Sequence, residues 1–237
     1  MVKLNVLSDE ALIAIVASAL PHSDQKPEDL LWAANAFVAA HRARPGGLTV
    51  EVGTRSGGSA LCWLRLIEAL YPGPFLPSVF SVDPYGRKPY VEYEQDTTMR
   101  YGDSHYLDMK RLLAPFANHA HFLLDSRAFF TLLVGEKLWR DAGENDGKNW
   151  TVESRFGEHT TFVFLDGDHT LEGIEGDLDA IYPWRAPACG GWRPVLTVID
   201  NVVHKDPRVM PMLQSDWDVV ISPSGIQALV RGRRSSP

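Results

Sequence analysis

The sequence predicts an α/β protein with a Rossmann-like, doubly wound and mostly parallel sheet of seven strands. Short apolar runs alternate with helical patterns, these runs end in acidic residues, and the first run leads into a glycine-rich turn. Such alternation is typical of a parallel sheet with helices on both faces. We also expect an N-terminal helical cap and a C-terminal antiparallel hairpin.

The bulk composition is that of an ordinary globular protein. A length of 237 residues, with 45% hydrophobic and 22% charged residues, predicts a single domain, residues 1–237. We divide it into a helical cap, residues 1–44, and a core, residues 45–232. The formal net charge of −7 argues against a nucleic-acid partner. Cys62 and Cys189 have no neighbour at metal-ligand or redox spacing, which suits a reducing, cytoplasmic location.

Two helical patterns, residues 8–20 and 28–41, form the predicted cap. The apolar run 11–20 is too short to span a bilayer, and Ser8 in front of it is a typical helix N-cap. We therefore predict a packed helix rather than a signal peptide, and no membrane partner. The cap either covers a pocket or forms the surface of a homo-oligomer, and the sequence leaves both open.

The predicted parallel strands share a short apolar run with an acid at its end. They are residues 48–52, 79–82, 121–124, 161–165 and 195–199. Ligands of parallel α/β sheets bind outside the carboxyl ends of the strands, so we expect these acids to converge on one crevice. A helix is expected over 171–182, and the segments 218–221 and 226–230 predict the terminal hairpin.

The turn Gly53-Thr-Arg-Ser-Gly-Gly-Ser59 lies between the first strand and a helical pattern, residues 60–70. Its glycines permit close approach of the backbone to a ligand, and the helix N-terminus offers unpaired N–H groups. Glu51 would repel a pyrophosphate but attract the amino group and sulfonium of S-adenosylmethionine (AdoMet), which we therefore predict as the cofactor. The candidate contacts around the turn are Glu51, Gly53, Thr54, Ser56, Gly57 and Ser59.

Two further strand ends are candidates for the rest of the cofactor. Asp83 could accept both hydroxyl hydrogens of a ribose, as carboxylates do in nucleotide-binding sheets. The alternative is a turn begun by Asp83 with Pro84. Asp125 and Ser126 lie where an adenine ring would arrive, and the alternative for them is a helix cap.

At these motifs the chain resembles class I AdoMet-dependent methyltransferases. Glu51-Val-Gly53 with Gly57 and Ser59 is similar to the Glu-Leu-Gly-x-x-x-Gly-x-Ser turn of catechol-type O-methyltransferases. Arg55 departs from the Gly-x-Gly-x-Gly form of the wider class but agrees with the catechol-type turn. The resemblance covers residues 45–232 in order of elements, and it implies that this core is catalytic.

Asp166 follows the fourth predicted strand, and Asp200 with Asn201 follows the fifth. Two carboxylates and an amide oxygen suit Mg²⁺ or a similar ion, which would acidify a bound substrate hydroxyl. Metal-dependent catechol-type and caffeoyl-CoA-type O-methyltransferases carry an Asp and an Asp-Asn pair at these places, so the resemblance implies the same three metal ligands. The alternative is that Asp166 and Asp200 contact AdoMet or the substrate without a metal.

His169 is the candidate general base. It stands where these relatives have a lysine, and an imidazole can take a proton at neutral pH without a large pKa shift. In the alternative view, His169 is a hydrogen-bonded surface residue and Asp168 or Thr170 caps the next helix. His204 and Lys205 are further candidates for the proton acceptor.

The segment Asp166-Gly-Asp-His-Thr-Leu-Glu-Gly173 also resembles bacterial methyltransferases of sugars and other natural products. Those usually carry His-Asp or Asp-Asp after the fifth strand, so Asn201 favours the catechol-like metal set. The predicted partner is a small hydroxylated molecule. Aromatic residues in loops could clamp it, or simply pack: Tyr85, Tyr90, Tyr93, Trp184 and Trp192.

Three other functions compete with a metal-assisted O-methyltransferase. The first is a metal-independent methyltransferase that uses His169 or His204. The second is an oxidoreductase with a dinucleotide at the glycine turn, although Glu51 opposes pyrophosphate and no second mononucleotide unit is evident. The third is a catalytically silent AdoMet-binding module.

Overall fold

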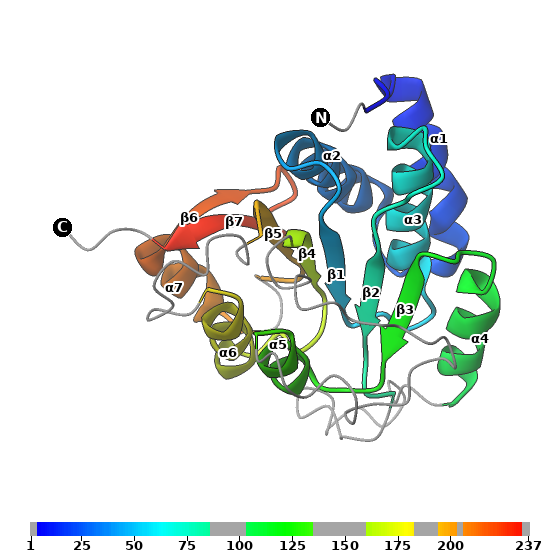
Figure 1. The fold of residues 1–237 in the computed structure, drawn as a ribbon. Helices are drawn as coiled ribbons and strands as arrows, with labels where there is room; N and C mark the ends of the chain where they lie inside the picture. The colour runs from blue at the N-terminus through cyan, green and yellow to red at the C-terminus, as the bar shows by residue number, and fades with distance from the viewer. Residues whose placement is uncertain (1–3, 86–102, 135–159, 183–193, 203–205, 234–237) are drawn as a thin grey trace.

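A computed structural model describes residues 4–85, 103–134, 160–182, 194–202 and 206–233. A seven-stranded sheet runs through it in the order β3-β2-β1-β4-β5-β7-β6 (Figure 1). The strands are β1 Leu48–Val52, β2 Val79–Val82, β3 His119–Phe122, β4 Thr160–Leu165, β5 Leu196–Ile199, β6 Trp217–Ile221 and β7 Ala228–Arg233. β1 to β5 pair in parallel, and β7 is antiparallel to both β5 and β6, which confirms the predicted mostly parallel sheet and terminal hairpin.

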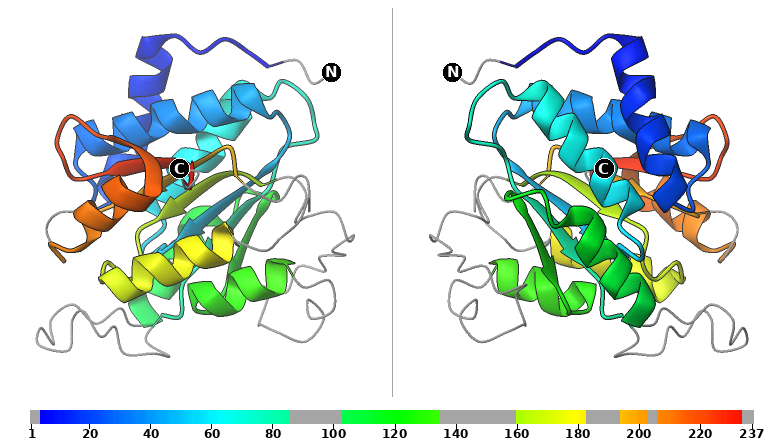
Figure 2. Two further views of the ribbon diagram at one scale, coloured as in Figure 1. Left: turned by 90° about the vertical axis from the view of Figure 1, so that its left-hand side faces the viewer. Right: turned by 90° about the vertical axis from the view of Figure 1, so that its right-hand side faces the viewer.

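Helices cover both faces of the sheet. They are α1 Asp9–Ala19, α2 Pro27–Ala43, α3 Gly58–Leu70, α4 Asp103–Leu113, α5 Ser126–Val134, α6 Leu171–Ile181 and α7 Val209–Asp216, with a short 3₁₀ helix, η1, at Leu20–His22. Figure 2 shows α1, α2 and α3 on one side of the sheet and α5 and α6 on the other. The fold is therefore the doubly wound α/β arrangement that the alternating pattern predicts.

Strands β1 to β5 are buried on both faces, and their alternate side chains contribute to two separate cores. On β4, Phe162 and Phe164 pack toward α2 and α3, where Phe162 meets the Trp63 ring with centroids 5.3 Å apart. Val163 and Leu165 point to the opposite core with residues of α5 and α6. Continuous apolar runs in the sequence are explained by this two-sided burial.

The N-terminal helix is packed, as predicted. Ser8 accepts a hydrogen bond from the Ala11 N–H and caps α1, while Leu12, Val16 and Ala19 are buried. α1 contacts both α2 and α3. Among the described residues, no helix is both long and apolar enough to cross a membrane.

The predicted third strand is displaced by two residues. It was expected at 121–124, whereas β3 begins at His119 and ends at Phe122, in register with β2. His119 and His121 are both buried, and the His119 Nε2 atom lies 3.0 Å from the Ser81 hydroxyl. The prediction left out His119 and Ala120, because a histidine at the start of a strand is not evident from an apolar pattern.

Asp177 gives the fold a measurable pH dependence. It is buried on α6, and burial raises the pKa of its carboxyl to about 7, against a smaller lowering by a hydrogen bond from Ser126. The folded protein therefore binds this proton more tightly than the unfolded chain, so the contribution of Asp177 to stability is lost as pH rises from about 4 through 7.

We expect Asp177→Asn to remove this contribution. The difference in unfolding free energy between variant and wild type should grow with pH across that window, by at most about 1.4 kcal/mol per pH unit. Urea unfolding at several pH values measures it. Asp179→Asn, an exposed change on the same helix, serves as the control, and equal slopes for Asp177→Asn and wild type would contradict the prediction.

Candidate active site

A cavity of about 230 Å³ lies at the carboxyl ends of β1, β4 and β5. Its roof is the segment between α1 and α2, including residues 22–26, and its floor is the glycine turn. Eight predicted site residues line it: Gly53, Thr54, Ser56, Ser59, Asp166, His169, Asp200 and Asn201. The other five do not line it: Glu51, Gly57, Asp83, Asp125 and Ser126.

The glycine turn is shaped by contacts with the protein's own backbone. Gly53 has φ +83°, and a Cβ atom there would overlap the Asp166 carbonyl group, next to β4. Gly57 has φ +87° and caps α3. A Cβ on Gly58 would overlap the backbone of His22 in the roof. Gly53 therefore allows the end of β1 to lie against the end of β4, and Gly58 allows the start of α3 to lie against the roof segment.

Glu51 lies beneath the turn with its carboxylate fully buried. The Trp63 Nε1–H donates to Oε1 at 3.2 Å, and the Ser81 hydroxyl donates to Oε2 at 3.4 Å. Burial raises the pKa of Glu51 to about 7, the Asp166 charge adds to this, and hydrogen bonds from Ser59 and Trp63 oppose it. The charge of Glu51 thus reaches the cavity through the turn and not by direct contact.

Asp83, Asp125 and Ser126 have structural partners. The Asp83 carboxylate accepts the N–H groups of Arg55 at 3.0 Å and Tyr85 at 2.9 Å. Asp125 accepts the Ala128 N–H at 2.8 Å, as a helix cap does, and Ser126 hydrogen-bonds Asp177. The turn and cap alternatives are realised, while ribose and adenine contacts stay predictions.

Asp166, His169 and Asp200 converge on one end of the cavity. The His169 Nε2 atom lies 3.4 Å from Oδ1 of Asp166, and only 3% of His169 is exposed. Burial, followed by the charge of Asp166, raises the pKa of Asp200 to about 7. Asn201 follows with its backbone in the left-handed region at φ 52°. An imidazole with a carboxylate beside it thus lines the cavity.

The donor set suits a hard cation in its chemistry, since Asp166, Asp200 and Asn201 present oxygen groups to the same cavity. The mutual repulsion of the two carboxylates is a cost that a cation would relieve. Within the described part of the chain, however, no three side chains of His, Cys, Asp or Glu are grouped closely enough to hold a metal ion.

Two glutamines at the site were not foreseen from the sequence. Gln25 Nε2 donates to Asp166 Oδ2 at 2.9 Å, and Gln227 Nε2 donates to Asp200 Oδ1 at 2.7 Å. Gln25 comes from the roof segment and Gln227 directly precedes β7. No local pattern marks them, because each meets its carboxylate only through the tertiary fold.

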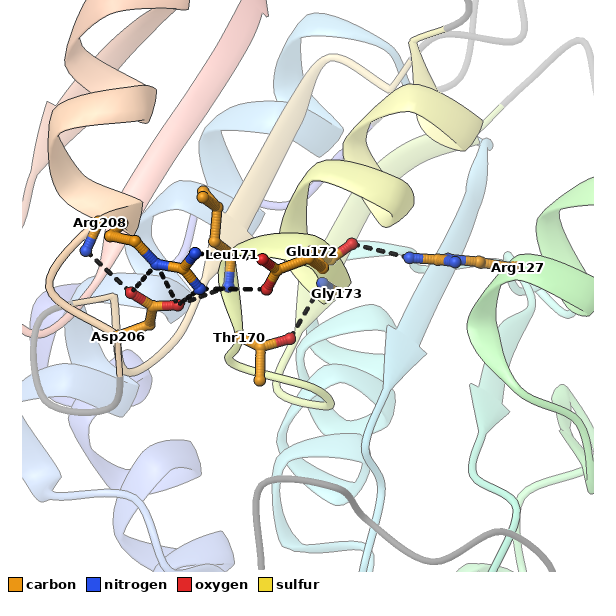
Figure 3. Close-up of polar contacts among 7 residues, drawn as sticks. All are labelled: Arg127, Thr170, Leu171, Glu172, Gly173, Asp206 and Arg208. Carbon is orange, nitrogen blue, oxygen red and sulfur yellow. Dashed lines mark hydrogen bonds and ion pairs between the residues drawn. The ribbon is translucent and has the colours of Figure 1, made fainter.

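Thr170 and Leu171, which directly follow His169, are anchored at the start of α6 (Figure 3). Thr170 caps the helix by accepting the Gly173 N–H at 3.1 Å, which realises the capping role considered for it. Asp206 accepts the Leu171 N–H at 3.0 Å, and Arg208 binds Asp206. These contacts fix the backbone just after His169.

Other candidates from the sequence fall outside the described residues. They are His204, Lys205, Tyr90, Tyr93, Trp184 and Trp192. Tyr85 is described, and its hydroxyl donates to the Arg55 carbonyl at 2.6 Å while its ring packs on Tyr106. Tyr85 therefore supports the glycine turn as a packing residue.

The same architecture occurs in solved methyltransferase structures. CalS11, a calicheamicin methyltransferase, superposes with a TM-score of 0.59 at 14% identity over 96% of this chain and 95% of its own. The SAH-bound methyltransferase PaMTH1 of Podospora anserina gives 0.51 at 14% identity over 96% of this chain and 89% of its own. This chain has the methyltransferase fold. No protein-family model and no curated sequence matches it.

The shared fold gives the cavity its context. In an α/β sheet the ligand lies outside the carboxyl ends of the strands, next to the point where strand order reverses. In this methyltransferase fold that point lies between β1 and β4, and the glycine turn and Asp166 flank it. The cavity therefore occupies the place where such a sheet binds its ligand.

Proposed function

We propose that the chain is an AdoMet-dependent methyltransferase that methylates a hydroxyl group of a small molecule. The observation that carries this proposal is the convergence of the glycine turn, two acidic strand ends and His169 on one cavity. The fold shared with SAH-bound PaMTH1 supports AdoMet as the donor. CalS11 is described as a TDP-rhamnose 3'-O-methyltransferase, which supports transfer to oxygen.

In this proposal the glycine turn and the start of α3 hold the cofactor. Gly53, Thr54, Ser56 and Ser59 line the cavity. Glu51 lies beneath the turn, and it would add negative potential when its carboxyl, whose pKa burial raises to about 7, is ionised. AdoMet supplies an electrophilic methyl group on a sulfonium, which a rim of acids favours. Asp83, Asp125 and Ser126 would meet the nucleoside part.

His169 would take the proton of the acceptor hydroxyl as the oxygen bonds to the methyl carbon and the carbon–sulfur bond breaks. Asp166 lies beside the ring and would stabilise the imidazolium that results. The products are the methyl ether and SAH. The cap at the start of α6 would hold the backbone next to His169 in place.

Asp166, Asp200 and Asn201 would hold a divalent ion such as Mg²⁺, whose chemistry is to lower the pKa of the acceptor hydroxyl.

The described cavity lining also favours a hydroxyl-rich, sugar-like acceptor, because Ile226 is its one aliphatic side chain. Hydroxyl groups need hydrogen-bond partners in a pocket, and these walls provide them.

A thermal-shift comparison of SAH with NAD tests the proposed cofactor. We expect SAH to raise the melting temperature and NAD to leave it unchanged, since Glu51 opposes a pyrophosphate. Stabilisation by NAD alone would favour the dinucleotide-binding oxidoreductase.

EDTA should abolish methyl transfer, and added Mg²⁺ should restore it. Methyl transfer that survives both EDTA and Asp200→Ala would show that the enzyme is metal-independent.

His169→Gln should lower methyl transfer by about 10²- to 10⁴-fold, the usual range for loss of a general base. SAH release from AdoMet, measured over a panel of sugars and phenols, gives the rate. SAH binding should persist in the variant, because His169 serves the acceptor side. A wild-type rate of methyl transfer in His169→Gln would indicate that His204, and not His169, is the general base.

A further inference from the structure

Gln25 and Gln227 form a continuous amide bridge between the two acidic strand ends. Beyond its bond to Asp166, Gln25 accepts a hydrogen bond on Oε1 from Gln227 Nε2 at 3.1 Å. The same Nε2 group donates to Asp200 at 2.7 Å. The order along the bridge is therefore Asp166, Gln25, Gln227 and Asp200.

The bridge is buried at its C-terminal end. Gln227 is fully buried and Asp200 is 2% exposed. Among the described residues, Gln227 Oε1 has no hydrogen-bond partner, which is unusual for a buried acceptor. Neutral amides orient the carboxylates by donating N–H groups but do not cancel their charge, so the site keeps its attraction for cations.

The roof segment that carries Gln25 is fastened at several points. The Gln25 backbone N–H donates to the Ser23 hydroxyl at 3.1 Å, and Asp24 forms an ion pair with Arg55 of the glycine turn. The backbone of His22 lies directly over Gly58. The bond from Gln25 to Asp166 is the point at which this roof reaches the reacting end of the cavity.

We infer that Gln25 and Gln227 are positioning residues of the proposed methyltransferase. They hold Asp166 and Asp200 facing the cavity, and they couple this alignment to closure of the roof formed by residues 22–26. The inference rests on the proposed function for its role in methyl transfer. The coupling of roof and carboxylates is a property of the chain itself and can be measured without turnover.

The test compares Gln25→Met, Gln25→Glu and Gln227→Met with wild type. Methionine keeps the length of the side chain and removes the donor, whereas glutamate keeps the shape and adds a negative charge beside Asp166. Gln214→Met, at an exposed position of α7, is the matched control. Circular dichroism first establishes that each variant is folded.

Three measurements follow on the full chain. Hydrogen exchange of the amides of residues 22–26 reports on the roof. Calorimetry with SAH reports on the cofactor site, and SAH release over the acceptor panel gives kcat and KM for AdoMet. Loss of a residue that orients functional side chains typically costs 10- to 100-fold.

We expect Gln25→Met to speed roof exchange about 10-fold and to lower kcat by 10- to 100-fold with a smaller change in KM. Gln25→Glu should have a lower kcat than Gln25→Met, although glutamate is closer in shape to glutamine. Gln227→Met should lower kcat similarly, and Gln214→Met should match wild type. A packing role alone predicts the reverse order for the two Gln25 variants.

The failure of each proposal has its own signature. The inference is wrong if residues 22–26 exchange at the wild-type rate in Gln25→Met. It is also wrong if Gln25→Glu has a higher kcat than Gln25→Met. In both cases, SAH binding by the wild type would still support the proposed methyltransferase. Absence of SAH binding by the wild type overturns the proposed function, and the exchange measurement still decides whether the bridge fastens the roof.

Discussion

Gly53→Ala should destabilise the protein by about 2–5 kcal/mol and abolish SAH binding. Alanine at φ +83° costs about 1–2 kcal/mol, and its Cβ would overlap the Asp166 carbonyl group. Relief of that overlap must push β1 and β4 apart, at a further cost of about 1–3 kcal/mol. Thermal unfolding should show a drop in melting temperature of at least about 4 °C.

Gly73→Ala provides the matched control for this change. Gly73 has no atom within 4 Å of the position of a Cβ, so the substitution should be close to neutral. If Gly53→Ala unfolds at the same temperature as Gly73→Ala, then Gly53 does not lie too close to the Asp166 carbonyl group to accept a Cβ atom, and the prediction is wrong.

Asp166→Asn should separate function from stability. The charge of Asp166 raises the pKa of both Asp200 and Glu51, so its removal relieves repulsion within the site. We expect the variant to be as stable as wild type or more stable, by up to about 2 kcal/mol at neutral pH. Methyl transfer should fall by about 100-fold or more, because the carboxylate that faces His169 is lost.

Urea unfolding and the SAH-release assay measure the two halves of this prediction. Asp216→Asn, an exposed change in α7, controls for general effects of removing an acid. An active but destabilised Asp166→Asn protein would assign Asp166 to the structure and not to the chemistry.

The sheet and the glycine turn could be predicted because their signals are local. Apolar runs, an acid at the strand end and glycines at fixed spacing all lie within a few residues of one another. The position of Asp166 and Asp200 at one edge of the sheet could be predicted for the same reason, since carboxyl ends of parallel strands meet there. Here β1, β4 and β5 are neighbours, and the two acids line one cavity.

The remaining features depend on contacts that a sequence does not reveal. Asp83 and Asp125 could bind a ligand or hold a turn, because the same carboxylate accepts hydrogen bonds in either role. The direction of Glu51 was equally hidden, since Trp63 turns its carboxylate toward α3. Gln25 and Gln227 carried no signal at all, because a glutamine has no preferred place in a pattern.

The joining of Gln25 to Gln227 links residues that are 202 positions apart in the chain. During synthesis, the first of them leaves the ribosome long before the second exists. The glycine turn and both acids can therefore be in place while the pocket still lacks its last wall. A chain that ended before Gln227 would carry the glycine turn and both acids and yet lack the hydrogen bond that joins Asp200 to the roof segment.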